Sequence, residues 1–486
     1  MIDSTITLFF DFPTTLNSPD FPEIEMMSFT GSTRAGKAVT CDAADTVKRV
    51  TLELGGKSPQ IVLPDCDLEL AVNGIISGIF PAAGQSCISG SRLLIHENVI
   101  EEFTNLLVEA VKDAKVGNPN DPLTHVGPIA HKLHYENILK KIEKAINDDE
   151  VDVVVEATGH PSSGIKHART CFKYGKHVIM VNVEADVLAG PSLSAEANSA
   201  EVVFSMAYGD QPSLTLEIIE WARASGFKVT AAGKGTKYMP EYHYSTPKTV
   251  WDHYGLTSDE AEKAGMNSKM FNSFLDGTKS SLEMSAIANA SGLNVPTNGL
   301  LFPPCGMDDL ASLLKEKNKG GILEKNEQVE VVSSLERDGR PVFKDLRWGV
   351  YAVLQAPNDY AASCFKQYGM NTDQSGEFSA MYKPFHLIGM ELNTSIFSAA
   401  LLKLPTGQTK YFKGDVVSIS KRNLKKGEKL DGEGGFTVWG KLIPANTSLN
   451  LKALPIGLAN DMYSVSYTHL RAHETVLDLV CRLLLE

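Results

Sequence analysis

Five charged residues in the middle of the chain have the types and spacing to do proton-transfer chemistry. Asp276, Lys279 and Glu283 are spaced i, i+3 and i+7 in a segment that we expect to be helical, so they should share one face. Lys234 lies in a predicted glycine turn after a strand and Lys237 follows it, so both can approach a ligand. Lysines can hold an enolate or oxyanion, and carboxylates can carry protons. The alternative for the helical face is a surface stripe of salt bridges.

A carboxylate and a thiol near the start of the chain form a second candidate set. Glu53 and Cys87 are separated by a helical stretch, so only folding can bring them together. Gly31 and Ser32 stand where a strand-like run passes into a helix, and such a turn can offer backbone N–H groups to a pyrophosphate. Taken singly, a buried free cysteine and a solvated glutamate are the simpler alternatives.

A strand, a helix and a second strand are predicted between residues 151 and 182. The first strand is a β-branched run, typical of a parallel strand covered on both faces. Ligands of such sheets bind beyond the carboxyl ends of the strands, so Thr158, Gly159 and Asn182 are expected near a nucleotide. A turn without any ligand is the alternative, because no glycine fingerprint stands on a strand-to-helix turn of this sheet.

Composition limits the classes of function that remain. The chain has 486 residues, 43% of them hydrophobic and 22% charged, which predicts a protein of several domains that is not embedded in a membrane. Its net charge of -13 argues against nucleic acid as a partner. The seven cysteines are scattered singly, which favours a reducing cytoplasm.

Residues 20–146 resemble the catalytic stretch of the aldehyde dehydrogenase superfamily. The motifs that carry the resemblance are SFTGST, LELGGKSP, GQSC and VGP. It implies that Cys87 attacks an aldehyde carbonyl, that Glu53 activates the water that releases the acid, and that NAD(P) accepts a hydride. Most of that family's nucleotide-binding domain normally precedes this region, so we expect a nucleophile without a working site.

Residues 150–460 resemble the homoserine-dehydrogenase-like oxidoreductases that carry a C-terminal SAF domain. The motifs are VVVEATG, AYGDQP, AAGKGTKY, FNSFLDGTKS, FPPCG, SSLERDGRP, DLRWGVY and DGEGGFTVWGKL. Relatives in this group include a 1-deoxyxylulose-5-phosphate reductoisomerase-like enzyme and a D-apionate oxidoisomerase, which rearrange a polyol skeleton and transfer a hydride with NAD(P)(H). Homoserine dehydrogenases themselves have a lysine directly after the asparagine of the second strand. Here Val183 and then Glu184 follow Asn182, so we expect a branched or phosphorylated polyol or a sugar acid as substrate.

The chemistry of such a rearrangement suits the first set of residues. A carbon–carbon bond beside a carbonyl is broken and remade only if an enolate is held, by a lysine or a divalent ion, while a carboxylate carries the hydroxyl proton. We expect the lysines of the set to polarise the substrate and its carboxylates to carry protons or bind a metal. These spacings form no recognisable metal cage, so no metal ligand is assigned.

The expected fold class is α/β, in five segments. Residues 1–147 form an aldehyde dehydrogenase fragment, 148–206 the second half of a Rossmann-like doubly wound NAD(P)-binding domain, 207–395 an α+β catalytic domain, 396–463 a small β-rich SAF-like domain and 464–486 a tail. No linker rich in Gly, Pro or Ser separates the first two segments, which predicts a chimeric joint near residue 148.

The last segment is predicted to derive from DNA adapters. Residues 466–475 back-translate onto a transposase adapter and residues 479–486 onto a flow-cell adapter, while Asp478 fits the codon that an index tag between them requires. An amphipathic helix is the alternative.

The sequence therefore predicts a cytoplasmic NAD- or NADP-dependent oxidoreductase or oxidoisomerase, impaired by truncation and acting on a small molecule, with homo-oligomers possible. The alternatives are a non-catalytic chimeric product and a residual aldehyde dehydrogenase. The residue that distinguishes NAD from NADP would lie in the missing first half of the nucleotide-binding domain.

Overall fold

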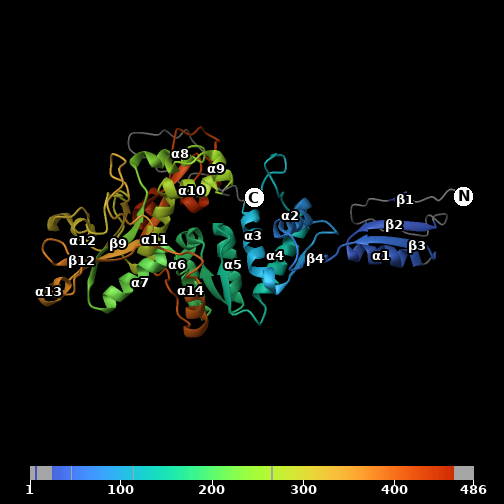
Figure 1. Cartoon of the computed structure of the whole chain (residues 1–486), viewed down its shortest axis with the longest axis horizontal. Coiled ribbons are helices and arrows are strands. Elements are labelled where there is room, and N and C mark those ends of the chain that lie inside the picture. Colours follow the sequence, from blue (N-terminus) through green and yellow to red (C-terminus); the bar gives the residue numbers. More distant parts are fainter. Residues whose placement is uncertain (1–5, 8–24, 45, 113, 264–265, 465–486) are drawn as a thin grey trace. The chain divides into compact units, whose positions relative to one another are not determined.

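The structure, a computed structural model, describes residues 6–7, 25–44, 46–112, 114–263 and 266–464. The chain divides into two compact units, Met1–Ile138 and Leu139–Glu486, called unit 1 and unit 2 below (Figure 1). The division falls inside helix α4 (Lys132–Ile146), ten residues before the joint expected near residue 148, which stays a prediction. The predicted tail from residue 465 onward lies outside the described residues.

Unit 1 contains two small parallel sheets in its described residues. In the first, β2 lies between β1 and β3, and α1 packs against β2 and β3. In the second, β4 pairs with β5, and α2 and α3 join it in one core cluster. Ile61 and Leu94 are register partners on the uncovered face of this pair, and both are mostly exposed. The elements are β1 (Ile6–Thr7), β2 (Met26–Gly31), α1 (Thr33–Ala44), β3 (Arg49–Leu54), β4 (Pro59–Val62), α2 (Leu68–Ile79), β5 (Arg92–Ile95) and α3 (Ile100–Val111).

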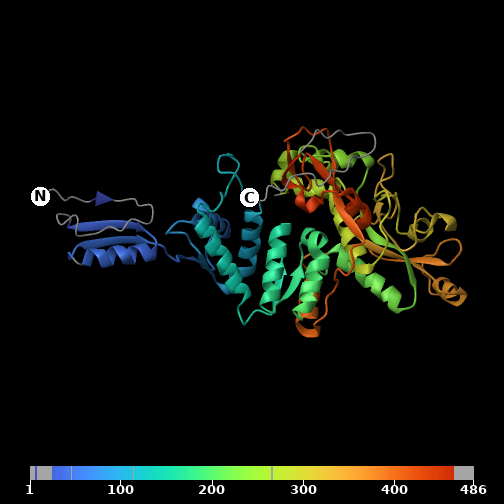
Figure 2. The same ribbon diagram turned by 180° about the vertical axis from the view of Figure 1, so that it is seen from behind.

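The first layer of unit 2 is a parallel sheet in the order β6-β7-β8, and it confirms the predicted strand, helix and strand. Val178 and Met180 of β7 pack against α5 and α6, which lie side by side in Figures 1 and 2, while Ile179 packs against α14 on the other face. Val154 of β6 packs against the α5–α6 face and Val153 against the α14 face, so both faces of this strand are covered in part, while Val155 is exposed. The elements are β6 (Val153–Glu156), α5 (Pro161–Lys173), β7 (His177–Met180), α6 (Val183–Ser199), β8 (Phe204–Met206) and α14 (Asn393–Phe397).

The second layer is a mixed sheet in the order β10-β9-β11-β12. Gly233 and Gly235 lie inside strand β9, where an added Cβ would come within 1.8 Å of the Glu330 carbonyl oxygen or 1.9 Å of the Leu346 carbonyl oxygen. The prediction of a glycine turn around Lys234 is therefore wrong, because these glycines allow other backbone segments to approach a strand. The elements are α7 (Gln211–Ala224), β9 (Lys228–Thr236), α12 (Leu310–Leu313), β10 (Gln328–Ser333), β11 (Val350–Gln355), α13 (Asp359–Gln367) and β12 (Phe378–Lys383).

The third layer follows α14 in the chain and is rich in β-structure, as expected for residues 396–463. Strand β13 pairs antiparallel with β15, and β14 pairs antiparallel with β16. Its elements are β13 (Gly414–Ser420), β14 (Lys429–Asp431), β15 (Val438–Pro444), α15 (Ala445–Leu451) and β16 (Asn460–Tyr463). The remaining helices of unit 2 are α8 (Val250–Tyr254), α9 (Ser258–Lys263), α10 (Ser268–Leu275) and α11 (Thr278–Ser291).

Helix α11 contacts all three layers of unit 2. It packs against α6 of the first layer, α7, β9 and β10 of the second, and β13 and β15 of the third. Every residue of this helix is buried except Lys279 and Ser291. Its many alanines and serines suit this position, because small side chains let neighbouring elements approach closely from every side. The helix therefore fixes how the three layers are arranged around it.

Gly277 separates α10 from α11. Its φ of 88° is left-handed backbone that glycine adopts without strain, and it interrupts the segment expected to be one helix. The prediction that Asp276 shares a helical face with Lys279 and Glu283 is therefore wrong, because Asp276 ends α10.

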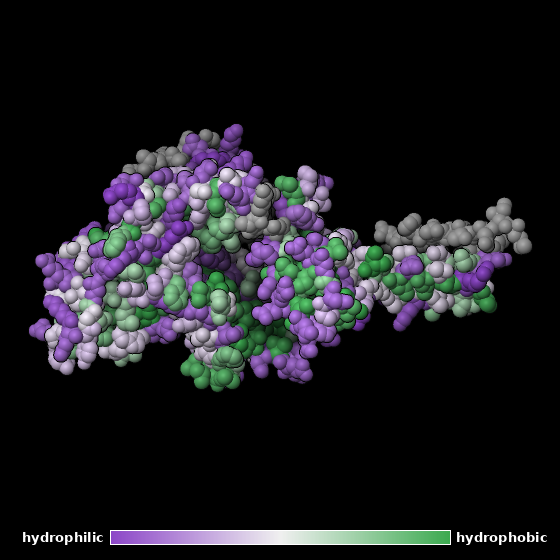
Figure 3. Space-filling view, viewed as in Figure 1, coloured by the Kyte–Doolittle hydropathy of each residue, from purple (hydrophilic) through white to green (hydrophobic). Residues whose placement is uncertain are grey.

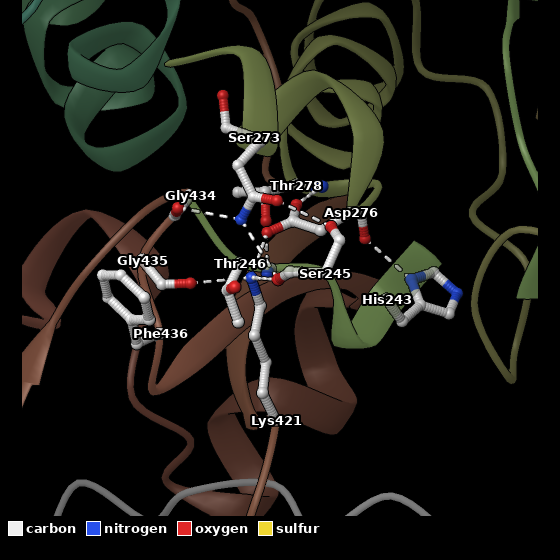
Figure 4. A network of polar contacts seen from close by, with 12 residues as sticks. His243, Ser245, Thr246, Ser273, Asp276, Thr278, Lys421, Gly434, Gly435 and Phe436 are labelled. Atoms are coloured by element: carbon white, nitrogen blue, oxygen red, sulfur yellow. Dashed lines mark hydrogen bonds and ion pairs between the residues drawn. The ribbon is translucent and has the colours of Figure 1, made fainter. Parts of the chain in front are cut away.

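Asp276 instead forms a buried ion pair with Lys421, the residue that directly follows β13. Lys421 Nζ lies 2.7 Å from Asp276 Oδ2, 2.7 Å from the Ser245 carbonyl oxygen and 2.8 Å from the Gly435 carbonyl oxygen (Figure 4). The lysine and aspartate side chains are 2% and 0% exposed. Three acceptors match the three N–H groups of an ammonium, so the buried charge is fully paired. This contact ties the third layer to the junction of α10 and α11.

An apolar patch of unit 2 appears in Figure 3 as a green area at the lower edge. It lies over α14 and the residues after it, where Phe397, Leu401 and Leu402 are exposed. Within the described residues, no helix combines the length and the hydropathy that crossing a membrane requires.

Replacing Lys421 by methionine leaves the Asp276 carboxylate buried without a partner. We expect the free energy of unfolding of unit 2 to fall by about 3–5 kcal/mol. Lys425→Met, in the exposed turn that follows in the same layer, is the matched control and should change it by less than about 0.5 kcal/mol. Urea unfolding monitored by tryptophan fluorescence measures both, and equal midpoints would contradict a stabilising role for the buried pair.

Candidate active site

Lys279 extends from the start of the buried helix α11 toward solvent. Its Nζ lies 2.7 Å from Oε1 of Glu184, in the first turn of α6. The two side chains are 17% and 13% exposed. This ion pair is therefore partly exposed to solvent.

The charge on Lys279 is fixed by the carboxylates around it. Desolvation alone would lower the pKa of this lysine, but the charges of Glu184, Asp210, Glu283 and Glu433 outweigh it and raise the pKa above its usual value. The side chain is thus an ammonium at neutral pH. It can polarise a carbonyl or hold an oxyanion, but it cannot act as a base.

Lys234 and Glu283 form a second ion pair, which is closed to solvent. Lys234 stands on β9 and Glu283 lies one turn after Lys279 on α11, and their side chains are only 8% and 4% exposed. Lys234 Nζ also donates to Gln211 Oε1 at 3.0 Å. The structure brings these two predicted residues together, but as a buried pair.

Asp210 lies at the start of α7, beside these charges. Its carboxylate accepts the backbone N–H of Gln211 at 2.8 Å. Burial, and then the negative charge of Glu283, raise its pKa to about 6, while Lys279 and Lys234 lower it in part. Asp210 therefore completes a group of carboxylates around Lys279.

Lys237 makes its contacts with α8, away from the charges around Lys279. Its Nζ donates to the His253 carbonyl oxygen and lies 5.4 Å from the centre of the Tyr254 ring, both in α8. Burial, and then the charge of Arg347, lower its pKa. These contacts argue against the role of polarising cation that the sequence suggested for it.

The residues expected near a nucleotide do lie at the carboxyl ends of β6 and β7. Thr158 Oγ1 donates to Glu156 Oε1 at 2.6 Å, and the Gly159 backbone, with a φ of 66°, turns the chain toward α5. Asn182 caps α6 by accepting the Ala185 N–H at 3.1 Å.

Two buried atoms at this edge have no hydrogen-bond partner in the described structure. They are Oε2 of Glu156 and Nδ2 of Asn182. A polar ligand group near the strand ends is compatible with them, but no glycine-rich turn able to hold a diphosphate follows a strand of this described sheet. The fit to a dinucleotide is therefore partial.

Acidic residues gather around Lys279 without forming a metal centre. Among the side chains that the structure describes, no three His, Cys, Asp or Glu residues are placed to hold an ion. The ammonium of Lys279 is a cationic group that can hold a substrate oxygen.

Glu184 is the site residue that the sequence alone did not identify as functional. It stands two positions after Asn182 and directly after Val183, which occupies the place where homoserine dehydrogenases have a lysine. Its position in the first turn of a helix that follows a parallel strand was the available signal, since such turns line ligand sites.

The predicted residues of unit 1 lie in exposed positions. Glu53 is near the end of β3, and Cys87 follows a short turn of helix after α2. In the described structure neither side chain has a hydrogen bond or an ion pair. Ser32 Oγ accepts the Ala35 N–H at 3.2 Å, so it caps α1, and Gly31 ends β2. Without a base or a donor beside it, Cys87 has nothing to activate its thiol.

Two family models match this chain. The model described as oxidoreductase DRL, catalytic domain, matches residues 209–392, and that of the aldehyde dehydrogenase family matches residues 19–172. The aldehyde dehydrogenase match runs past the expected joint into α5. Neither model describes a homoserine dehydrogenase or a SAF domain, so that finer identification stays a prediction.

Individual relatives are similar to a limited part of the chain. Hydroxyisobutyraldehyde dehydrogenase from Mycolicibacterium austroafricanum is 42% identical over 122 residues, covering 25% of this chain and 24% of that protein. Lactaldehyde dehydrogenase from Methanocaldococcus jannaschii is 44% identical over 126 residues, covering 26% and 27%. The structure of a betaine aldehyde dehydrogenase from Staphylococcus aureus in complex with NAD+ is 38% identical and covers 26% and 25%, with a TM-score of 0.24.

The chain thus spans about a quarter of the length of these relatives. Both matched models describe oxidoreductases, which confirms the prediction of an enzyme. Two parts of the chain match oxidoreductases: one is an aldehyde dehydrogenase fragment, and the other is a DRL catalytic domain.

Proposed function

We propose that unit 2 carries the site of an NAD(P)-dependent oxidoreductase or oxidoisomerase that acts on a small polyol, sugar acid or sugar phosphate. The observation that carries the proposal is the partly exposed Lys279–Glu184 ion pair at the end of an otherwise buried helix. Hydroxylated substrates suit it, because their oxygens accept hydrogen bonds from an ammonium. Helix α11 lies within the residues matched by the oxidoreductase DRL model, which supports the reaction class.

In this proposal Lys279 stabilises negative charge on a substrate oxygen. It stays protonated throughout, since the surrounding carboxylates raise its pKa. Glu184 holds the ammonium in place at 2.7 Å, and the buried Lys234–Glu283 pair lies on the same helix one turn further on. When bound, the nicotinamide cofactor supplies or accepts a hydride, and Thr158, Gly159 and Asn182 would lie nearest to it.

The finer assignment is to the homoserine-dehydrogenase-like enzymes with a C-terminal SAF domain. The β-rich third layer, packed against α11, supports this assignment. All six cysteines in the described residues are free, which supports a reducing cytoplasm as its location. Branched or phosphorylated substrates stay the preferred class, because Val183, followed by Glu184, stands where homoserine dehydrogenases have a lysine.

Lys279→Met removes the polarising charge but keeps the length of the side chain. We expect kcat/KM to fall by about 10²–10³-fold, as when one oxyanion donor is lost. The assay monitors NADPH or NADH absorbance with a panel of branched sugar acids, including D-apionate, and sugar phosphates. Lys410→Met, a mostly exposed lysine, is the matched control and should leave the rate unchanged. Equal activity of both variants would exclude Lys279 from the reaction.

A non-catalytic chain is the second candidate function. The position of β6 at the edge of the described sheet and the partial fit to a dinucleotide favour it. Titration of the full chain with NADPH, observed by cofactor fluorescence, separates the two candidates. Saturable binding at micromolar concentration supports the oxidoreductase, whereas no binding supports the non-catalytic chain.

For unit 1 we expect no oxidation of simple aldehydes with NAD+. Cys87 and Glu53 are both exposed, and neither has a hydrogen-bond or ion-pair partner among the residues that the structure describes. The purified full chain and its Cys87→Ala variant should therefore give the same background rate of NADH formation. A rate well above background that Cys87→Ala abolishes would show that the fragment retains aldehyde dehydrogenase activity.

A further inference from the structure

Unit 2 contains a cavity of about 560 Å³ where the segment between β9 and α8 and the loop after α11 meet strand β15. Its volume is within the range of small-molecule pockets, roughly 300–1,000 Å³. Ser281 of α11 lines the cavity, whereas Lys279 and Glu184 do not. Two residues along an α-helix correspond to a rotation of about 200°, so Ser281 lies on the opposite side of α11 from Lys279. The cavity is therefore separate from the Lys279–Glu184 ion pair.

Two stacked pairs of rings line this cavity. The ring centres of Tyr238 and Phe302 lie 4.1 Å apart, and those of His243 and Trp439 lie 3.8 Å apart. A hydrogen bond joins the two pairs, since the Tyr238 hydroxyl oxygen lies 3.0 Å from Nε2 of His243. Walls of this kind favour a ligand with a planar ring, because such a ring can stack on an aromatic face or meet an aromatic edge.

The orientation of His243 is fixed by hydrogen bonds on both sides of its ring. Its Nδ1 lies 2.7 Å from the Asp276 carbonyl oxygen, and Figure 4 marks this contact with a dashed line. A carbonyl oxygen only accepts, so Nδ1 carries a hydrogen, and Nε2 of the neutral ring accepts from the Tyr238 hydroxyl. The aromatic wall is therefore held in place before a ligand arrives, which lowers the entropic cost of binding.

Ser281 contributes a hydroxyl that the described fold does not use. The residue is only 2% exposed, and its side chain forms no hydrogen bond with another described residue. A buried hydroxyl normally has a hydrogen-bond partner. Because Ser281 lines the cavity, an oxygen atom of a ligand can be that partner.

Lys441 of β15 contributes a positive charge to the lining. Its aliphatic stem passes over Gly299, where an added Cβ would lie 2.7 Å from Cε of Lys441. Gly299 has a φ of 90°, so a glycine suits both the backbone conformation and the approach of the lysine. Glu241 also lines the cavity, but it is exposed, so water screens its repulsion of an anion. An ammonium beside a hydroxyl favours a carboxylate as the ligand group.

We propose that this cavity is a second small-molecule site of unit 2, which binds an aromatic carboxylate. The ring of the ligand contacts the two aromatic pairs, and its carboxylate accepts hydrogen bonds from Lys441 and Ser281. This site goes beyond the proposed oxidoreductase reaction, because the Lys279–Glu184 ion pair takes no part in it.

The first test is isothermal titration calorimetry of the full chain with three probes. Benzoate has the ring and the charge, benzyl alcohol has the ring without the charge, and gluconate has the charge without the ring. Benzoate should bind with a Kd below about 1 mM, and benzyl alcohol about 10-fold more weakly, because a hydrogen bond to a charged group is lost. Absence of saturable heat with benzoate would overturn the site. Gluconate binding as tightly as benzoate would overturn the aromatic class of ligand.

The second test places the bound benzoate. Lys441→Met should raise its Kd about 10-fold and Ser281→Ala about 5-fold, as expected for the loss of a charged and a neutral hydrogen bond. Lys425→Met, an exposed lysine of the same layer, is the matched control and should leave the Kd unchanged. Wild-type affinity in both Lys441→Met and Ser281→Ala would show that benzoate binds elsewhere.

Lys279→Met separates this inference from the proposed function. This variant should bind benzoate with the wild-type Kd, because Lys279 does not line the cavity. Loss of benzoate binding in Lys279→Met would place the ligand at the Lys279–Glu184 ion pair and overturn the second site. Conversely, unchanged benzoate binding together with unchanged oxidoreductase activity in Lys279→Met would overturn the proposed function and support the second site.

Discussion

The enclosure of helix α11 is the constraint on which the rest of unit 2 depends. A helix that is buried on every side must have a neighbour on each face, and here the neighbours come from three layers that lie far apart in the sequence. Lys279, near the amino end of this helix, is partly exposed. The packing of one helix thus decides both how the layers assemble and where a charged group meets solvent.

The ion pairs around α11 differ in exposure. This difference separates the pairs that stabilise the fold from the pair that can contact a substrate. Lys421–Asp276 and Lys234–Glu283 are sealed, so each is a paired charge that a ligand cannot reach. Lys279–Glu184 is partly open. Sealed pairs fix the geometry of the elements that carry them, because breaking either one leaves a buried charge without a partner. The open pair can exchange contacts with a substrate at a lower cost, because water already reaches it.

Unit 1 shows how a recognisable motif differs from a working site. The motif around Cys87 is that of a nucleophile, and the aldehyde dehydrogenase model matches the surrounding residues. Yet the thiol is exposed and has no partner in the described structure, and the β4–β5 pair has an uncovered apolar face. A nucleophile needs a lowered pKa or an adjacent base, and a sequence motif supplies neither by itself.

The sequence by itself determined the α/β class, the strand, helix and strand at residues 153–180, the common face of Lys279 and Glu283, and the resemblance to oxidoreductases in both parts. These follow from local periodicity and short motifs, which need no knowledge of distant residues. Only the tertiary structure decided that Gly233 and Gly235 lie inside a strand, that Gly277 removes Asp276 from the helical face, and that Lys279 meets Glu184. The last contact joins residues 95 positions apart, and the Lys421–Asp276 pair joins residues 145 apart. Which charges pair, and which stay open to solvent, depends on the burial that assembly of the layers creates, and no local pattern in the sequence encodes it.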